Sequence, residues 1–233
     1  HPMHAGTGEL ISSAIIKAVK ITKMPDGVFS NINSGGIQTG IDLINNPLVK
    51  AVGFTGSLKA GRSLLNLANE RNEPIPVFAE MGSINPVIIL PEILKTDWTN
   101  LATKYANSIT LGSGQFCTNP GIIIGIKSAY FTHFENSLAE KILDIAPSCM
   151  LHPNILRNYN KNKQEIISDK KVNIVANYDD DVEVNYSKQT LAKVKGSDFL
   201  INNDLQEEIF GPFSLLVECD NMSQLKSVVN KIN

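Results

Sequence analysis

One cysteine, Cys117, lies in a stretch that could present a thiol for chemistry. Residues 112–121 read Gly-Ser-Gly-Gln-Phe-Cys-Thr-Asn-Pro-Gly and follow an apolar segment. Glycines let the backbone approach a ligand closely, and Asn-Pro-Gly favours a tight bend. A thiol on such a bend, with amide N–H groups nearby, is suited to act as a nucleophile. A buried cysteine in a structural turn is the alternative that this stretch leaves open.

Acidic residues in two stretches could take part in such chemistry. Glu80 ends the apolar run 77–80, directly before a Gly-Ser turn. If this run is a buried strand, its terminal carboxylate could be desolvated, which would raise its pKa towards that of a useful general base. A solvated strand end is an equally good interpretation. Glu207 and Glu208 precede Ile-Phe-Gly-Pro at 209–212, and alone they read as a solvated loop.

A third candidate is the turn between an apolar strand and a helix at residues 53–61, Gly-Phe-Thr-Gly-Ser-Leu-Lys-Ala-Gly. Amides at a helix N-terminus attract phosphate, and glycine allows its close approach. Ser57 is equally a good helix N-cap, so the phosphate signal is weak. The stretch matches neither the Walker A loop nor the G-x-G-x-x-G fingerprint.

The remaining cysteines and the first histidines give less specific signals. Cys149 and Cys219 lie in apolar surroundings, and we expect both in the core. The three cysteines are odd in number and widely spaced, so we expect no disulfide framework. This cysteine usage favours a reducing compartment such as the cytoplasm. His1 and His4 have no second ligand cluster, so we expect no metal site.

The composition excludes several classes of function. The 233 residues are 42% hydrophobic and 19% charged, enough for a sizeable core. The 21 basic and 23 acidic residues give a net charge of −2, which provides no field to recruit nucleic acid or an anionic membrane. No run approaches the ~20 apolar residues that a bilayer span needs.

Helix and strand patterns alternate along the chain, which predicts βαβ units and a parallel sheet. We expect helices at about 6–23, 37–45, 57–70, 97–109, 130–145, 155–168 and from 222, and strands at 28–32, 51–55, 77–80, 87–90, 122–126, 199–201 and 213–217. The turn-rich segment 81–86 predicts a boundary between a domain at 1–80 and a domain at 81–233. The last helix reaches the end of the chain, so we expect the second domain to be incomplete.

Taken together, the motifs resemble those of the aldehyde dehydrogenase superfamily in order and spacing. The matching stretches are Phe54-Thr55-Gly56-Ser57, Glu80-Met81-Gly82-Ser83, Gly114-Gln115-Phe116-Cys117 and Glu207-Glu208-Ile209-Phe210-Gly211-Pro212. They look most like the branch acting on 2,5-dioxovalerate (α-ketoglutaric semialdehyde), which is similar to the NADP-preferring fatty-aldehyde dehydrogenases. His1 to Leu10 also matches a segment of that branch.

The resemblance implies an α/β fold: the second half of a Rossmann-like cofactor domain followed by most of a catalytic domain. It covers this whole chain but about half of a family member, so we expect a central piece of a homo-oligomeric enzyme. The lysine that reaches the adenosine ribose and the asparagine that completes the oxyanion hole would precede His1.

The resemblance also implies a role for each candidate residue. Cys117 would attack the aldehyde, its backbone N–H would stabilise the oxyanion, and Glu80 would activate water to hydrolyse the thioester. NAD or NADP would be bound by Gly53, Thr55, Gly56, Ser57, Gly61, Glu208 and Phe210, with Glu208 on the nicotinamide ribose and Phe210 against the nicotinamide. Ser83 replaces a glycine found in much of the superfamily, a substitution proper to this branch.

Three alternatives remain. A coenzyme-A-dependent acylating relative would end the thioester by thiol transfer, but such enzymes generally lack the glutamate found here as Glu80. The isolated chain could instead be a non-catalytic fragment. A cysteine hydrolase is the remotest, since only His133 and His152 could approach Cys117 in space.

Overall fold

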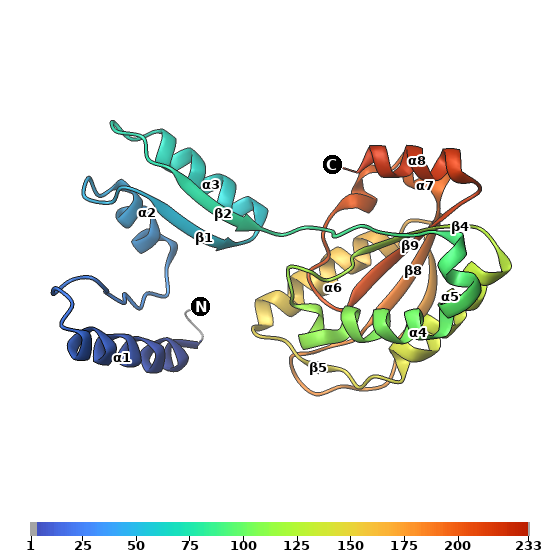
Figure 1. Cartoon of the computed structure of the whole chain (residues 1–233), viewed down its shortest axis with the longest axis horizontal. Helices are drawn as coiled ribbons and strands as arrows, with labels where there is room; N and C mark the ends of the chain where they lie inside the picture. The colour runs from blue at the N-terminus through green and yellow to red at the C-terminus, as the bar shows by residue number, and fades with distance from the viewer. Residues whose placement is uncertain (1–3, 233) are drawn as a thin grey trace. The chain divides into compact units, whose positions relative to one another are not determined.

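The computed structural model describes residues 4–232, which divide into two compact units (Figure 1). The first unit ends at Met81 and the second begins at Gly82. Residues 1–3, including His1 of the N-terminal motif, lie outside the described residues. We describe each unit by itself.

The first unit contains a two-stranded parallel sheet with a helical crossover. Its elements are α1 (Ala5–Thr22), α2 (Ile37–Asn45), β1 (Val52–Gly56), α3 (Leu58–Asn69) and β2 (Val77–Met81). β1 and β2 pair in parallel from Val52↔Val77 to Gly56↔Met81, which confirms the predicted βαβ arrangement. Ser57 caps α3, since its Oγ accepts a hydrogen bond from the Ala60 N–H at 3.3 Å.

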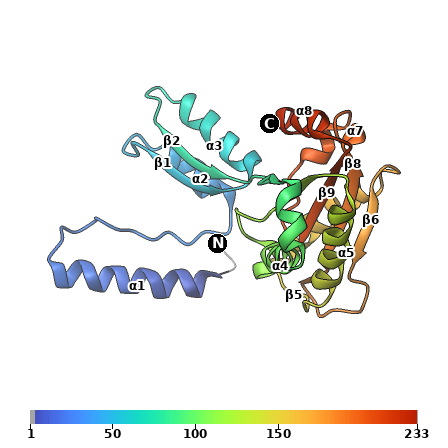
Figure 2. The same cartoon turned by 45° about the vertical axis from the view of Figure 1, so that its right-hand side comes forward.

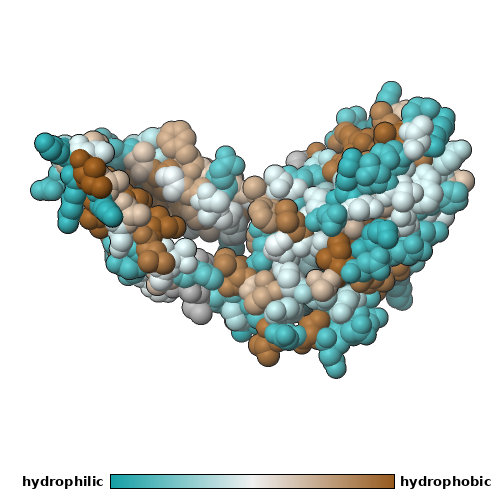
Figure 3. All heavy atoms as spheres, turned by 60° about the horizontal axis from the view of Figure 1, so that its bottom comes forward, coloured by the Kyte–Doolittle hydropathy of each residue, from teal (hydrophilic) through white to brown (hydrophobic). Residues whose placement is uncertain are grey.

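The core of the first unit is small, and its strands are less buried than predicted. Ile44, Ala68 and Ile75 form the buried cluster. Along β2, half-buried residues alternate with exposed ones, and Phe78 is 70% exposed. The expected burial of this strand is therefore wrong for the described residues. Figure 3 shows hydrophobic side chains at the surface of the molecule. The exposed large hydrophobic residues of this unit include Leu10, Ile37, Leu48 and Phe78.

The second unit is built on a five-stranded sheet in the order β3-β4-β9-β8-β6. All neighbours are parallel except β6, which is antiparallel to β8. The elements of this unit are β3 (Val87–Ile89), α4 (Pro91–Thr110), η2 (Leu111–Gly114), β4 (Ile122–Ile126), α5 (Ala129–Leu143), β5 (Ser148–Cys149), α6 (Pro153–Ile167), β6 (Asn173–Asn177), β7 (Tyr186–Ser187), β8 (Thr190–Lys195), α7 (Gly196–Phe199), η3 (Asn203–Gln206), β9 (Phe213–Cys219) and α8 (Met222–Lys231).

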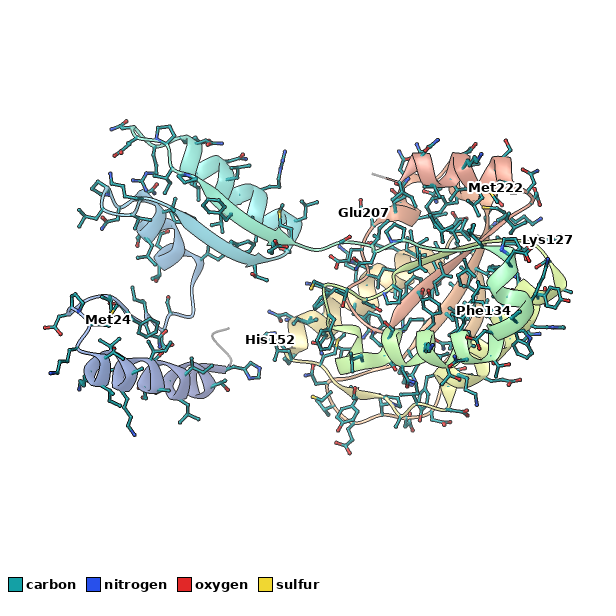
Figure 4. All side chains as sticks on the ribbon, in the orientation of Figure 1. Met24, Lys127, Phe134, His152, Glu207 and Met222 are labelled. Atoms are coloured by element: carbon teal, nitrogen blue, oxygen red, sulfur yellow. The ribbon has the colours of Figure 1, made fainter. Side chains whose placement is uncertain are left out.

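Helices cover both faces of this sheet, as the burial along β4 shows. Ile122 and Ile124 pack with residues of α6, α7 and α8, whereas Ile123 packs with residues of α4 and α5. Successive side chains of a strand point to opposite faces, so one apolar run supplies both cores. Figure 2 shows α4 and α5 together on one side of the sheet, and Figure 4 shows Phe134 of α5, which is fully buried.

The structure corrects four further predictions about elements and burial. No strand forms at 28–32, where no neighbouring strand pairs with the segment. The strand expected at 199–201 is wrong, because Phe199 ends the short helix α7 and the apolar run is too short to show a period. α4 begins at Pro91 rather than 97, and its kink lies at Asp97. Cys149 is exposed in the two-residue strand β5, whereas Cys219 is buried as predicted.

Candidate active site

Cys117 is an exposed free thiol on the segment that leads from η2 into β4, here called the cysteine loop (residues 115–121). Three residues before the loop have positive φ: Gly112 at 54°, Ser113 at 58° and Gly114 at 65°. A Cβ on Gly114 would lie 2.3 Å from the carbonyl oxygen of Gly211. Gly114 is therefore required both by its conformation and by the close approach of another backbone segment.

Hydrogen bonds hold the cysteine loop against two segments distant in sequence. The Gly121 N–H donates to the Ile84 carbonyl at 2.9 Å, and the Asn119 side-chain amide donates to the Gly211 carbonyl at 2.9 Å. The Asn85 side-chain amide donates to the carbonyl oxygens of Cys117 and Asn119 at 2.7 and 3.0 Å. The loop is thus fixed between residues 83–86 and residues 208–212.

Glu208 and Phe210 lie in the second of these segments, beside the labelled Glu207 in Figure 4. Glu208 is half-buried, and burial raises the pKa of its carboxyl above the ordinary value of 4.5, partly offset by a hydrogen bond from the Ser83 N–H. A Cβ on Gly82 would lie 1.8 Å from Oε2 of Glu208, so the carboxylate of Glu208 packs directly against the Gly82 backbone.

A small cavity joins these groups. Its volume is about 20 Å³, room for about one water molecule, and its lining includes Ser83, Gly114, Phe116, Asn119, Glu208 and Phe210. The structure therefore brings Glu208 and Phe210 together with the neighbours of Cys117, although they are about 90 residues apart in sequence.

We expect Glu208→Gln to stabilise the second unit at neutral pH. Because burial raises the folded pKa of Glu208, its charged form is disfavoured in the folded state. The free-energy cost of burying the charged carboxylate is fully present above the pKa of Glu208 in the folded state. It is absent below the pKa of Glu208 in the unfolded state. The substitution should therefore raise the thermal midpoint at pH 8, and this gain should disappear as the pH falls towards 4. The fluorescence of Trp98, the single tryptophan, measures the midpoint at each pH.

Glu207→Gln is the control for this effect, since Glu207 is the exposed neighbour and should give no such gain. A gain from Glu208→Gln that is as large at pH 4 as at pH 8 would contradict the assignment to desolvation of the carboxylate.

The other predicted residues lie in the first unit, and four of them are at the carboxyl edge of its sheet. Thr55 and Glu80 are register partners at the ends of β1 and β2, and Gly56 and Ser57 lead into α3. Glu80 is exposed, so the desolvation considered above is not present in this chain.

Gly53 and Gly61 are not part of that edge. Gly53 lies within β1 with open space around its Cα, whereas Gly61 is buried and a Cβ there would lie 2.6 Å from Sδ of Met81. Gly61 therefore serves the close packing of α3 on β2.

The turn at the start of α3 suits an anionic group. The exposed residues Thr55, Gly56 and Ser57 precede the free N–H end of a 12-residue helix, where the helix dipole favours a phosphate. These residues fit the pyrophosphate of a dinucleotide, and the carboxylate of Glu208 fits a ribose hydroxyl as a hydrogen-bond acceptor.

The histidines considered above have other positions. His133 lies on α5 with its ring 5.6 Å from that of Trp98, and His152 caps α6, its Nδ1 accepting from the Asn154 N–H at 2.9 Å. Within residues 4–232 no group of three His, Cys, Asp or Glu side chains is arranged to hold a metal ion.

Asn85 and Asn119 are the site residues that the sequence analysis missed. Both precede a proline, at Asn85-Pro86 and Asn119-Pro120, and this repeated dipeptide is the signal that could have drawn attention to them. Their partners are 32 and 92 residues away, so no local pattern identifies the contacts.

Known proteins are similar to this chain in sequence and in structure. The family model described as the aldehyde dehydrogenase family matches residues 5–233. The alpha-ketoglutaric semialdehyde dehydrogenase of Acinetobacter baylyi is 36% identical over 233 residues, which is 100% of this chain and 44% of that protein. Alpha-ketoglutaric semialdehyde dehydrogenase 2 of Azospirillum brasilense is 36% identical over 232 residues, with the same coverage of 100% and 44%.

A solved structure shows the same fold. The NAD-dependent benzaldehyde dehydrogenase of Corynebacterium glutamicum superposes with a TM-score of 0.75 at 20% identity, over 90% of this chain and 46% of that one. This chain spans less than half the length of the two curated relatives, at 44% of each. Among the helices of residues 4–232, none has the length and apolar character needed to cross a membrane.

Proposed function

Because the chain belongs to the aldehyde dehydrogenase family, which its match over residues 5–233 shows, we propose that the whole protein oxidises an aldehyde to a carboxylate with NAD or NADP. The relatives named as alpha-ketoglutaric semialdehyde dehydrogenases support a semialdehyde substrate such as 2,5-dioxovalerate. The single observation that carries this proposal is the exposed thiol of Cys117 on a loop fixed against residues 208–212, which contain Glu208 and Phe210.

Cys117 is the nucleophile in this proposal. Its thiolate sulfur forms a bond to the aldehyde carbon, and the carbonyl oxygen becomes an oxyanion near the Cys117 backbone N–H. When bound, NAD or NADP would supply the hydride acceptor that this oxidation needs, and Cys117 would then hold the oxidised carbon as a thioester. The product at this stage is a covalent acyl-enzyme.

Glu80 is the general base that releases the product. Its carboxylate takes a proton from water, the water oxygen attacks the thioester carbon, and the carbon–sulfur bond breaks. The products are a carboxylic acid and the regenerated Cys117 thiolate.

The two units divide the remaining work in this proposal. The first unit belongs to the cofactor domain, where Gly53, Thr55, Gly56, Ser57 and Gly61 form or support the phosphate side of the site. The second unit belongs to the catalytic domain, where Glu208 would hold the nicotinamide ribose and Phe210 would lie against the nicotinamide. The helix start at Ser57 and the acceptor oxygens of Glu208 support these roles.

The state of the cysteines bears on the compartment in which the protein acts. All three cysteines are free thiols, which supports a reducing compartment such as the cytoplasm. We propose a homo-oligomeric whole protein with a small aldehyde as its substrate, without a nucleic-acid or membrane partner.

Reduction of cofactor by the whole protein is the test of this function. With 2,5-dioxovalerate and NADP⁺ or NAD⁺, we expect the absorbance at 340 nm to increase only when the aldehyde is present. Simple aliphatic aldehydes serve as comparison substrates. The 233-residue chain alone should give little signal, since it spans 44% of the relatives' length. Absence of activity with every aldehyde and both cofactors in the whole protein would refute the proposal.

A further inference from the structure

We propose that Asn85 is a positioning residue that holds Cys117 in its reactive orientation, an inference that rests on the proposed function. Asn85 is half-buried in the segment between β2 and β3 and reaches across to the cysteine loop. It does not touch the substrate in this proposal, and it acts through the backbone of Cys117.

The side-chain amide of Asn85 lies at the centre of three carbonyl oxygens. Its Nδ2 is 2.7 Å from the oxygen of Cys117, 3.0 Å from that of Asn119 and 3.2 Å from that of Ser83. An amide NH₂ has two donor hydrogens, so it can satisfy the two loop carbonyls at once. The shortest of the three contacts is the one to the nucleophile's own carbonyl.

This contact matters because packing does not hold the thiol. The side chain of Cys117 is exposed, so neighbouring side chains do not hold it in place. The direction of its Cα–Cβ bond is set by its backbone. Holding the Cys117 carbonyl fixes the peptide plane on one side of the residue. The Asn119 N–H donates to the Phe116 carbonyl at 3.1 Å, which closes the turn around Cys117 from the other side.

The backbone of Asn85 supports a dedicated role for its side chain. Its φ is +43°, in the left-handed region where most non-glycine residues are strained by about 1–2 kcal/mol. Glycine would meet the conformational demand without strain, but it lacks the amide that reaches Cys117 and Asn119. Asparagine is one of the few residues that tolerates this conformation and supplies a donor.

Asn85→Gly therefore separates the two roles, because it keeps the backbone conformation and removes the donor. In the whole protein we expect kcat to fall by about 10- to 100-fold, the size of effect that a small misplacement of a reacting group produces. KM for the cofactor should stay within about twofold. The rate constant for alkylation of Cys117 by iodoacetamide, measured by peptide mapping, should fall together with kcat.

Asn185→Gly is the matched control. Asn185 also has positive φ, at 70°, and its side-chain amide also donates to a carbonyl, that of Met150 at 2.5 Å. The same substitution there should leave kcat and the alkylation of Cys117 unchanged. Asn85→Asp is the second variant, since it keeps the shape but replaces the donor by an acceptor, and it should lower kcat at least as much.

The outcomes distinguish this inference from the proposed function. If Asn85→Gly or Asn85→Asp lowers only the thermal midpoint and leaves kcat and alkylation as in the wild type, Asn85 is merely structural and the inference is wrong. If Cys117→Ala, assayed in parallel, remains active, the proposed function itself fails. Should the glycine variant not fold, the aspartate variant decides by the same measurements.

Discussion

Cys117→Ala in the whole protein is expected to lower kcat for aldehyde oxidation by at least about a thousandfold, since removal of a covalent nucleophile leaves only the catalysis that binding and orientation provide. The thermal midpoint should change little, because the side chain is exposed and fills no core volume. Aldehyde-dependent absorbance at 340 nm and a thermal melt of the same sample measure the two quantities.

Cys149→Ala is the matched control for this substitution. Cys149 is the other exposed cysteine, and it lies in β5 outside the cysteine loop. Its replacement should leave kcat within about twofold of the wild type. Equal losses from Cys117→Ala and Cys149→Ala would mean that neither thiol is the nucleophile.

Glu80→Gln should separate the two halves of the reaction. The first turnover needs the nucleophile and the cofactor, whereas later turnovers need water to be activated, so we expect a burst of reduced cofactor followed by a steady state slower by about 10²–10⁴-fold. Mass spectrometry of the quenched protein should show the acyl group on Cys117. Stopped-flow absorbance at 340 nm measures both phases.

Glu70→Gln provides the comparison, since Glu70 is an exposed glutamate of the same unit at the end of α3, away from the carboxyl edge of the sheet. It should show no burst and normal turnover. If Glu80→Gln also turned over normally, Glu80 would not be the base, and thiol transfer to coenzyme A would become the better account of how the thioester ends.

Local signals in the sequence were sufficient for the parts of the site that form locally. Ser57 could be predicted as the cap of α3 from its place before an amphipathic run, and the glycines before Cys117 predicted a tight approach of backbone. The apolar run at 122–126 predicted β4, because each isoleucine of this strand packs in one of two cores.

Features that depend on tertiary contacts could not be predicted. β6, at 173–177, lies in a polar stretch, and its residues do not alternate between buried and exposed as those of a typical strand do. This strand forms because it pairs with β8. Burial of Glu208 comes from its docking on Gly82 and Ser83, more than 120 residues earlier. The bond from Asn85 to Cys117 likewise depends on how the chain folds back, not on either motif alone.

The different environments of the three cysteines make the chain convenient for spectroscopy. Cys219 is fully buried, and burial raises the pKa of its thiol to about 11, so at neutral pH it is protonated and out of reach of reagents. A Cys149→Ala background therefore leaves one accessible thiol, that of Cys117. A trifluoromethyl or fluorescent tag attached there would report on the cysteine loop alone, without the further cysteine substitutions that such labelling usually requires.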